Sequence, residues 1–377
     1  MTSIAIVGAG LAGSGTAWRL AQAGHDVTVL ERFAPANAFG SSHGSARIFR
    51  YAYPEQEYVH LVTLARQGWT ELESAAGETL IDLVGSVDFG PLRAQSGLAG
   101  LLAAEGVEHE VLGSAVARER WGQIAFDTDV LWTPGAGVID AERAVMAMLT
   151  LAQRLGADVR TDFPVVRVER AGAGYRVIGA DGTAVEAEQV VVAAGGWLPD
   201  LLGDLGLPDA FLSSLPSLRV TQENAFHFPY RDPSATWPTM IRKAPQIQTY
   251  ALPGGRDAGF TGLKIAEYNG GKPILSATHQ DRTIDPVNRE RVIDFVTEFL
   301  PGLVPEPYAE ATCLFTSTPD EDFIIDRVEG ITVLSPCSGH GAKFAPLIGE
   351  FAAALVAGSA DAVPTRFRTG MGAELVA

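Results

Sequence analysis

The stretch Ile4-Ala5-Ile6-Val7-Gly8-Ala9-Gly10-Leu11-Ala12-Gly13 decides the fold of the amino-terminal part of the chain. A short apolar run leads into three glycines, and a helical pattern follows them as far as Gly24. In a strand–turn–helix unit, Gly8 permits the tight turn, Gly10 lets the backbone approach a pyrophosphate, and Gly13 allows close packing of helix on strand. The helix N-terminus also attracts phosphate charge. The pattern therefore predicts a dinucleotide-binding turn.

A second apolar run, Val27 to Leu30, ends in Glu31, which lies about 20 residues beyond the glycines. A carboxylate at this point can accept hydrogen bonds from the ribose hydroxyls of the nucleotide. Three glycines alone are a weak signal, but here strand, glycines, helix, second strand and acidic residue arrive in the order of a nucleotide-binding unit. Dinucleotide binding is therefore expected, while the motif leaves open whether the nucleotide is FAD or NAD.

Composition and charge limit the classes of protein that the chain can belong to. Its 377 residues are 47% hydrophobic and 19% charged, and this length predicts two domains. The net charge of −17 argues against nucleic acid or an anionic membrane as a partner, because both need clustered Lys and Arg. No apolar stretch approaches the ~20 residues of a membrane span, and no basic leader precedes Ile4. With only Cys313 and Cys337, no disulfide framework is expected. We therefore expect a cytoplasmic monomer or small homo-oligomer.

The rest of the chain alternates between two patterns. Short β-like segments such as Ser86–Phe89 begin near residue 81, and residues 213–312 read as a mainly antiparallel sheet. Other expected elements are a helix over 138–155, a strand over 157–159, a buried parallel strand entering a glycine turn over 189–197, a strand over 330–334 and a helix over 346–356.

The expected fold class is therefore α/β plus α+β, with two interleaved domains. A Rossmann-type nucleotide-binding domain would comprise residues 1–80, 137–212 and 313–377, and a mainly antiparallel β-sheet substrate domain would comprise residues 81–136 and 213–312. Active sites favour such an interface between domains.

Two short stretches carry unusual local chemistry. In G-S-S-H-G-S-A-R-I-F-R, which spans residues 40–50, Arg47 and Arg50 follow a glycine- and serine-rich loop. A solvated surface pair is the ordinary alternative for these arginines. In S-G-H-G-A-K-F, which spans residues 338–344, Lys343 follows a glycine loop between an expected strand and an expected helix. The ordinary alternative is a β–α turn with an exposed lysine.

Together with T-P-D-E-D-F-I-I-D over residues 318–326, these stretches resemble the monomeric sarcosine oxidase and N-methyltryptophan oxidase family of FAD-dependent amine oxidases, in the D-amino acid oxidase superfamily. Pipecolate oxidases share the pattern, and the similarity runs from Gly8 to Lys343 and beyond. The resemblance implies FAD, a sheet-roofed substrate cavity above the flavin, and dioxygen as the oxidant. It implies oxidation of a secondary amine that bears a carboxylate, such as an N-methyl amino acid, with release of hydrogen peroxide.

The resemblance also implies roles for individual residues. Arg50 and Lys343 would clamp the substrate carboxylate, for which the planar fork of arginine is well suited. Lys264, in T-G-L-K, would activate dioxygen, because a fixed cation stabilises the negative charge that develops there. Arg47 and His43 would lie against the flavin and over the cavity.

Three further positions are implied in the same way. Tyr250 matches a cavity tyrosine, and Tyr268 stands in the substrate pocket where the family often has histidine. Cys313, in A-T-C-L-F-T, falls where the family attaches FAD through a thioether. Ser45-Ala46 and Ala342 also depart from the family pattern, and these changes surround the side-chain part of the pocket. They put sarcosine itself in doubt as the substrate.

The cofactor-binding residues expected from the motifs are Gly8, Gly10, Leu11, Ala12, Gly13, Glu31, Arg32, Ser41, Ser42, His43, Arg47, Val165, Gly195, Trp197, Cys313, Gly339, His340, Gly341 and Lys343, with no metal ligand among them.

The mechanism needs a neutral amine, because the nitrogen lone pair must assist the loss of hydride. A cluster of Arg47, Arg50, Lys264 and Lys343 would lower the amine pKa, so no general base is assigned. Two alternatives stay open. One keeps the chemistry and changes the substrate, to that of a deglycating fructosyl-amine or cyclic imino acid oxidase. The other is an electron-transferring flavoprotein subunit that does not use dioxygen.

Overall fold

The strand that precedes the glycine-rich turn lies inside a mainly parallel β-sheet. The computed structural model describes residues 2–369. In spatial order, the strands of this sheet are β20 (Ile324–Val328), β21 (Ile331–Ser335), β13 (Gln189–Val192), β1 (Ser3–Val7), β2 (Asp26–Leu30) and β9 (Asp158–Arg160). β1 pairs in parallel with both β13 and β2, and only β20 runs antiparallel to its neighbour. The expected parallel strand over 189–197 is thus confirmed, followed by the glycine turn.

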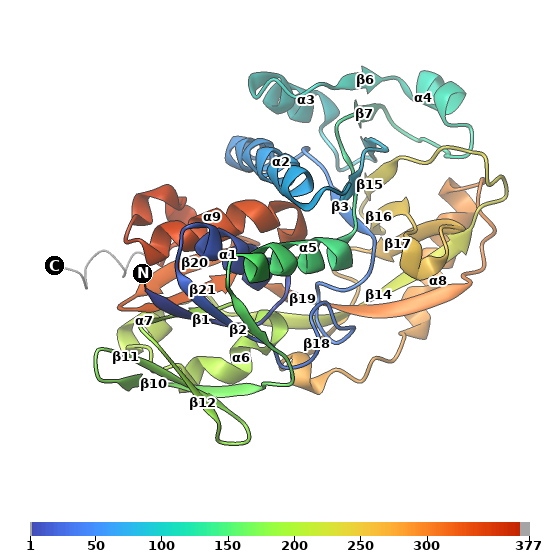
Figure 1. Cartoon of the computed structure of the whole chain (residues 1–377). Helices are drawn as coiled ribbons and strands as arrows, with labels where there is room; N and C mark the ends of the chain where they lie inside the picture. The colour runs from blue at the N-terminus through green and yellow to red at the C-terminus, as the bar shows by residue number, and fades with distance from the viewer. Residues whose placement is uncertain (1, 370–377) are drawn as a thin grey trace.

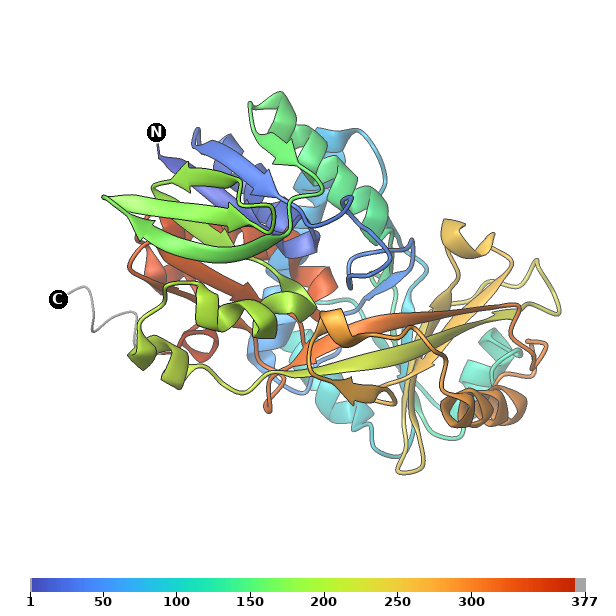
Figure 2. The ribbon, with the colours of Figure 1, turned by 90° about the horizontal axis from the view of Figure 1, so that it is seen from below.

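The apolar runs of this sheet are continuous because both of its faces are buried. Ile4 and Ile6 of β1 pack into one hydrophobic cluster, whereas Ala5 and Val7 pack into another. Helices cover the first face: α1 (Leu11–Gln22), α2 (Gln56–Ala76), α5 (Ala141–Arg154) and α9 (Ala345–Val356). A three-stranded antiparallel sheet covers the second: β10 (Val165–Ala171), β11 (Gly174–Gly179) and β12 (Ala184–Ala187). Figures 1 and 2 show this layer on the far side of the sheet from α1 and α9.

A larger, mainly antiparallel sheet occupies the other half of the molecule (Figure 1). Its strands are β18 (Lys272–Ile274), β14 (Arg219–Pro229), β17 (Gly262–Glu267), β16 (Gln248–Pro253), β15 (Thr239–Lys243), β5 (Ser86–Phe89), β7 (Val130–Thr133) and β6 (Glu110–Leu112), with β19 (Ala309–Ser317) paired to β14. Only β15 and β5 pair in parallel. Together the two sheets confirm the expected fold class.

One helix in this half was not expected from the sequence. α8 (Pro286–Phe299) packs its Phe295 against Phe226 and Leu263 of the large sheet. Its start is marked by Asp285, whose carboxylate accepts a hydrogen bond from the Val287 N–H. The smaller helices are α3 (Gln95–Ala104), α4 (Ser114–Arg120), α6 (Leu198–Leu201) and α7 (Asp209–Ser214).

The helix expected from Val138 was wrong in its first residues. Gly137–Ile139 forms strand β8, which pairs with β3 (Arg47–Phe49) and β4 (Ile81–Asp82). The β-branched residues of this segment find strand partners from two distant parts of the chain, and this pairing overrides the local helical pattern. The helix α5 begins only after Asp140, whose side chain caps it by accepting from the Arg143 N–H at 3.0 Å.

We retain the division into two interleaved domains as a proposal. The strands of the parallel sheet come from residues 1–80, 137–212 and 313–377, which supports the proposed nucleotide-binding part. The proposed boundary between residues 312 and 313 cuts through β19, which pairs with β14 of the large sheet over its whole length. In the described part of the chain, no helix is both long and apolar enough to cross a bilayer.

Replacing Gly13 by alanine is expected to destabilise the fold by about 1–3 kcal/mol. A methyl group at Gly13 would overlap the backbone oxygen of Gly8. The helix and the strand are therefore in contact at these two glycines. Gly100 in α3 is the matched control, since no atom lies within 4 Å of its added methyl group. Helix propensity favours alanine at both positions by about 1 kcal/mol. A difference in stability between the two variants therefore comes from the clash at Gly13. Urea unfolding of the two variants measures the difference, and equal stabilities would contradict the packing role of Gly13.

Candidate active site

One cavity joins the glycine-rich turn of the parallel sheet to the inner face of the large sheet. Most of the residues expected to bind cofactor or substrate line it. They are Gly8, Gly10, Leu11, Ala12, Glu31, Arg32, Ser41, Ser42, Arg47, Arg50, Val165, Gly195, Trp197, Tyr250, Lys264, Tyr268, Cys313, Gly339, His340, Gly341 and Lys343. Gly13 packs beneath the turn instead, as its expected role requires. The roles of all these residues remain predictions.

His43 does not line the cavity, although it was expected to lie over it. Its Nδ1 lies 2.7 Å from the Gly40 carbonyl oxygen, so the ring is held in its own loop. Burial, followed by the Arg47 charge, lowers the pKa of His43 to about 4. A neutral ring behind Arg47 supports the loop more directly than it could take part in chemistry. The catalytic role assigned to His43 stays a prediction, and the structure places the ring outside the cavity wall.

The nucleotide end of the cavity has the groups that a dinucleotide needs. The residue that precedes α1 is Gly10, which has no side chain to cap the helix, and both Gly10 and Leu11 line the cavity at the helix N-terminus. A methyl group at Gly10 would lie 2.9 Å from Ser42 Oγ, which accepts a hydrogen bond from the Leu11 N–H at 3.0 Å. Glu31 is held by the Ala9 N–H, which donates to its Oε2 at 2.7 Å. The residues present therefore fit FAD: the N-terminus of α1 would hold its pyrophosphate, and Glu31 would hold its ribose.

The two clamp residues meet across the ring of Tyr53. The Arg50 guanidinium carbon lies 4.5 Å from the centre of this ring, and the Lys343 Nζ lies 5.4 Å from it. The Lys343 side chain is 3% exposed, and its ammonium donates to the His340 carbonyl at 2.6 Å. Burial, followed by the Arg50 charge, lowers the pKa of Lys343 well below its ordinary value. An anion bound between Lys343 and Arg50 would offset both the burial of the ammonium and the repulsion from the Arg50 charge.

The loop that carries Lys343 depends on its glycines. A methyl group at Gly341 would overlap the Pro336 oxygen, and one at Gly339, where φ is +73°, would clash with the Phe315 ring. At the other end of the loop, the Trp69 indole N–H donates to the Lys343 carbonyl at 2.7 Å. The lysine is therefore fixed by its backbone as well as by its side chain.

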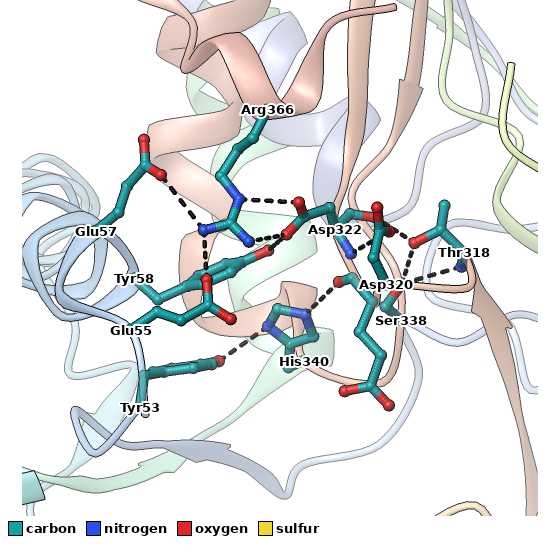
Figure 3. A network of polar contacts seen from close by, with 11 residues as sticks. Tyr53, Glu55, Glu57, Tyr58, Thr318, Asp320, Asp322, Ser338, His340 and Arg366 are labelled. Atoms are coloured by element: carbon teal, nitrogen blue, oxygen red, sulfur yellow. Dashed lines mark hydrogen bonds and ion pairs between the residues drawn. The ribbon is translucent and has the colours of Figure 1, made fainter. Parts of the chain in front are cut away.

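A polar network around His340 holds the same loop (Figure 3). The His340 Nε2 lies 3.0 Å from the Glu321 carbonyl, and its Nδ1 lies 2.9 Å from the Tyr53 hydroxyl. A carbonyl only accepts, so Nε2 carries the proton and Nδ1 accepts from Tyr53. Burial, followed by the Lys343 charge, lowers the pKa of His340 well below its ordinary value, which keeps the ring neutral.

The expected flavin-side cations lie together on the opposite wall. Lys264 in β17 is buried, and burial followed by the Arg47 charge lowers its pKa to about 8. Arg47 is oriented by the backbone, because its guanidinium donates to the carbonyls of Ala46 and Ser41 at 2.9 and 3.1 Å. Burial raises the pKa of the Cys313 thiol, while the Arg47 and Lys264 charges oppose this shift. The three side chains thus share one electrostatic environment.

The remaining predicted residues lie on the sheet side of the cavity. Burial raises the pKa of Tyr250 well above its ordinary value, so this phenol stays neutral. Tyr268 lies with its ring centre 5.9 Å from that of Phe315. Burial also raises the pKa of Tyr268.

Sequence analysis missed several polar residues at this site, among them two charged residues of the cavity wall and one beside Arg47. Lys243 and Glu321 line the cavity, and Asp257 hydrogen-bonds Ser45 beside Arg47. Glu321 lies within the T-P-D-E-D-F-I-I-D stretch, so that motif could have drawn attention to it. Nothing in the local pattern distinguishes Lys243 or Asp257 from exposed charges.

This geometry defines a flavin-type nucleotide fold with a cationic substrate cavity, and comparisons with known proteins agree. Residues 3–355 match the family described as DAO, FAD dependent oxidoreductase, and the chain belongs to this family. It is 32% identical over 362 residues to an N-methyl-L-tryptophan oxidase of Yersinia pestis (strain Pestoides F), covering 92% of this chain and 93% of that protein. The expected family, FAD dependence and oxidoreductase class are thus confirmed.

Two solved structures extend the comparison. NikD, described as an unusual amino acid oxidase essential for nikkomycin biosynthesis, superposes with a TM-score of 0.84 at 25% identity over 97% of both chains. Amadoriase I of Aspergillus fumigatus, a fructosyl amine:oxygen oxidoreductase, gives a TM-score of 0.75 at 21% identity, covering 98% of this chain and 89% of that one. The second likeness supports the fold alone.

Proposed function

We propose that the enzyme oxidises a secondary amine that bears a carboxylate, an N-methyl amino acid or close analogue, with dioxygen as the acceptor. The observation that carries this proposal is the clamp formed by Arg50 and Lys343. Both line the cavity, and within residues 2–369 neither makes an ion pair with an acidic side chain. Buried cations normally have a charged partner, so the pair lacks an anion that a substrate carboxylate supplies.

The same cations prepare the amine for oxidation. When bound, FAD accepts the hydride of the carbon next to nitrogen. Loss of hydride requires the neutral amine, and Arg50, Lys343, Arg47 and Lys264 all disfavour a further positive charge in the cavity. Each unit by which they lower the amine pKa corresponds to about 1.4 kcal/mol. The chain therefore needs no general base, because bulk water receives the amine proton.

Lys264 serves the second half of the cycle in this proposal. Its buried ammonium lies among Arg47, Cys313 and Asp257, where a low dielectric strengthens its effect on charge that develops on dioxygen. The two electrons removed from the amine reach dioxygen, which leaves with two protons as hydrogen peroxide. Water then hydrolyses the imine product to an aldehyde and an amine.

A peroxide assay with purified enzyme and a panel of N-methyl amino acids tests the proposal. Peroxide with one or more of them, and none with the matching primary amino acids, is the expected result. If peroxide forms only with fructosyl amines or cyclic imino acids, the proposed substrate class is wrong and one of these two classes takes its place. Reduction of a dye without consumption of oxygen would indicate an electron-transferring flavoprotein.

We also propose a covalent bond between the flavin and Cys313. Its support is the position of the thiol in the cavity wall, beside the Arg47 and Lys264 charges that favour a thiolate. Acid-precipitated enzyme is expected to stay yellow, and mass spectrometry of a protease digest should find FAD on the peptide that contains Cys313. Cys313→Ser should release all flavin on denaturation.

Cys337 provides the matched control for this prediction. It also lines the cavity, and burial raises the pKa of both thiols, but no cation of the described chain opposes this shift at Cys337, where the pKa rises to about 11. Cys337 is therefore the poorer nucleophile. Cys337→Ser should therefore retain the bound flavin. Flavin that washes out of the wild-type enzyme in acid would remove the covalent bond from the proposal and leave the oxidation chemistry unaffected.

A further inference from the structure

The cavity wall contains a lysine that the proposed mechanism does not use. The whole sequence has four lysines, Lys243, Lys264, Lys272 and Lys343, and three of them line this cavity. Lys264 and Lys343 have proposed roles, whereas Lys243, the last residue of β15, has none. Placing a lysine inside a cavity costs free energy, because its ammonium loses hydration. Solubility does not explain this position, since the chain already has a net charge of −17.

The ammonium of Lys243 lies at the substrate end of the cavity. Its Nζ is 5.8 Å from the ring centre of Tyr268. Burial, followed by the Arg93 and Arg50 charges, lowers the pKa of Lys243, while Glu321 and Asp88 oppose this shift. Throughout the described chain, the ammonium has no hydrogen bond and no acidic group within 4.0 Å.

The neighbouring charges are already committed to other partners. Arg93 forms an ion pair with Asp88, and both side chains are buried, so this pair is neutral as a unit. The Glu321 carboxylate accepts a hydrogen bond from the Asn269 side-chain amide at 3.4 Å. A single substrate carboxylate can satisfy Arg50 and Lys343, which meet over Tyr53, and it leaves Lys243 without an anion.

We infer that the substrate carries a second negatively charged group, a side-chain carboxylate that pairs with Lys243. The substrate class is then an N-substituted amino dicarboxylic acid, with its α-carboxylate on Arg50 and Lys343. The small Ala342 beside the clamp and Tyr268 in place of the family's usual residue leave the side-chain part of the pocket different from that of sarcosine-type enzymes. This inference rests on the proposed function and adds the chemistry of the substrate side chain.

A pair of isosteric substrates tests the inference directly. N-methyl-L-glutamate and N-methyl-L-glutamine differ only in the charge of the side-chain group, and kcat/KM for each follows from peroxide release. We expect the glutamate derivative to be favoured by about tenfold or more, as for a charged hydrogen bond. An equal or reversed preference would overturn the inference.

Variants of Lys243 and Lys272 test whether the preference for the glutamate derivative depends on Lys243. Lys243→Met should reduce the ratio of the two kcat/KM values to near unity, and Lys243→Arg should restore most of it. Lys272→Met is the matched control, because Lys272 lies outside the cavity in an ion pair with Asp281 and should leave the ratio unchanged. A ratio that survives Lys243→Met contradicts the inference.

A binding experiment without turnover separates this inference from the proposed function. Glutarate and its monoamide, 4-carbamoylbutanoate, are titrated into oxidised enzyme while the flavin absorbance is followed. Glutarate should bind about tenfold or more tightly, and Lys243→Met should abolish the difference. Peroxide from N-methyl amino acids without any preference for the dianion overturns the inference alone. A Lys243-dependent preference for glutarate without peroxide overturns the proposed function and supports the second anionic site.

Discussion

Lys264→Met is expected to slow the reaction of reduced enzyme with dioxygen by roughly 10²–10³-fold, the effect of removing one preorganised electrostatic group. The side chain is buried near Arg47 and Cys313, where a low dielectric strengthens its charge. Methionine keeps the length and apolar stem of lysine, so the cavity keeps its shape. Reduction of the flavin by substrate should change little, because the clamp lies elsewhere in the cavity.

Stopped-flow absorbance of the two half-reactions measures this prediction, with Lys272→Met as a control that should alter neither. The charge argument also gives the sign of a pH effect. Burial lowers the pKa of Lys264 to about 8, so the cation is present below that pH and is lost as pH rises through it. Reoxidation should therefore slow with increasing pH in the wild-type enzyme and be insensitive to pH in the variant. A defect confined to the reductive half would assign Lys264 to substrate binding.

Arg50→Met and Lys343→Met are each expected to weaken substrate binding by about 1.5–3 kcal/mol, or roughly 10- to 150-fold in the dissociation constant. Each removes one charged donor to the carboxylate in a cavity that excludes most water. Lys343 is the more deeply buried of the two, and its backbone is held by Trp69. The loss should therefore come from the missing charge and not from movement of the loop.

The substrate concentration at which the flavin-reduction rate is half-saturated gives the dissociation constant for each variant. Arg50→Lys should recover only part of the affinity, because an ammonium cannot form the two parallel bonds of a guanidinium. As a second readout, the parent amine without a carboxylate should bind the variants and the wild type alike. Unchanged constants for both methionine variants would remove the carboxylate clamp from the proposal.

The sequence predicted those parts of the fold that depend on neighbouring residues. The turn at Gly8 and Gly13 is local, since one strand and one helix impose it, and its prediction was correct. The segment at Val138 was predicted as a helix, whereas its Ile139 pairs with Arg47 of β3 and Ile81 of β4, which lie 92 and 58 positions earlier in the sequence. Such long-range pairing leaves no periodic signal in the segment itself.

The same limit applies to the candidate site. Family motifs brought Arg50, Lys343 and Lys264 to one cavity, but no motif contains Lys243. It follows Arg242 in β15, and alternate residues of a strand face opposite sides of the sheet. Arg242 forms an ion pair with Asp127, whereas Lys243 lines the cavity. Only the position of the strand above the cavity determines which of the two adjacent cations can reach a substrate.

The network around His340 connects Arg366, near the carboxyl-terminal end of the described residues, to the proposed carboxylate clamp. Arg366 forms an ion pair with Asp322 at 2.8 Å, and Asp322 accepts a hydrogen bond from Tyr58, whose ring stacks on that of Tyr53 (Figure 3). Tyr53 in turn lies beneath both clamp cations and holds His340. A chain shortened before Arg366 would leave the buried Asp322 without its countercharge. We expect the effect to reach the proposed carboxylate clamp through Tyr58 and Tyr53, so that residues far from the cavity wall would also influence affinity for the substrate.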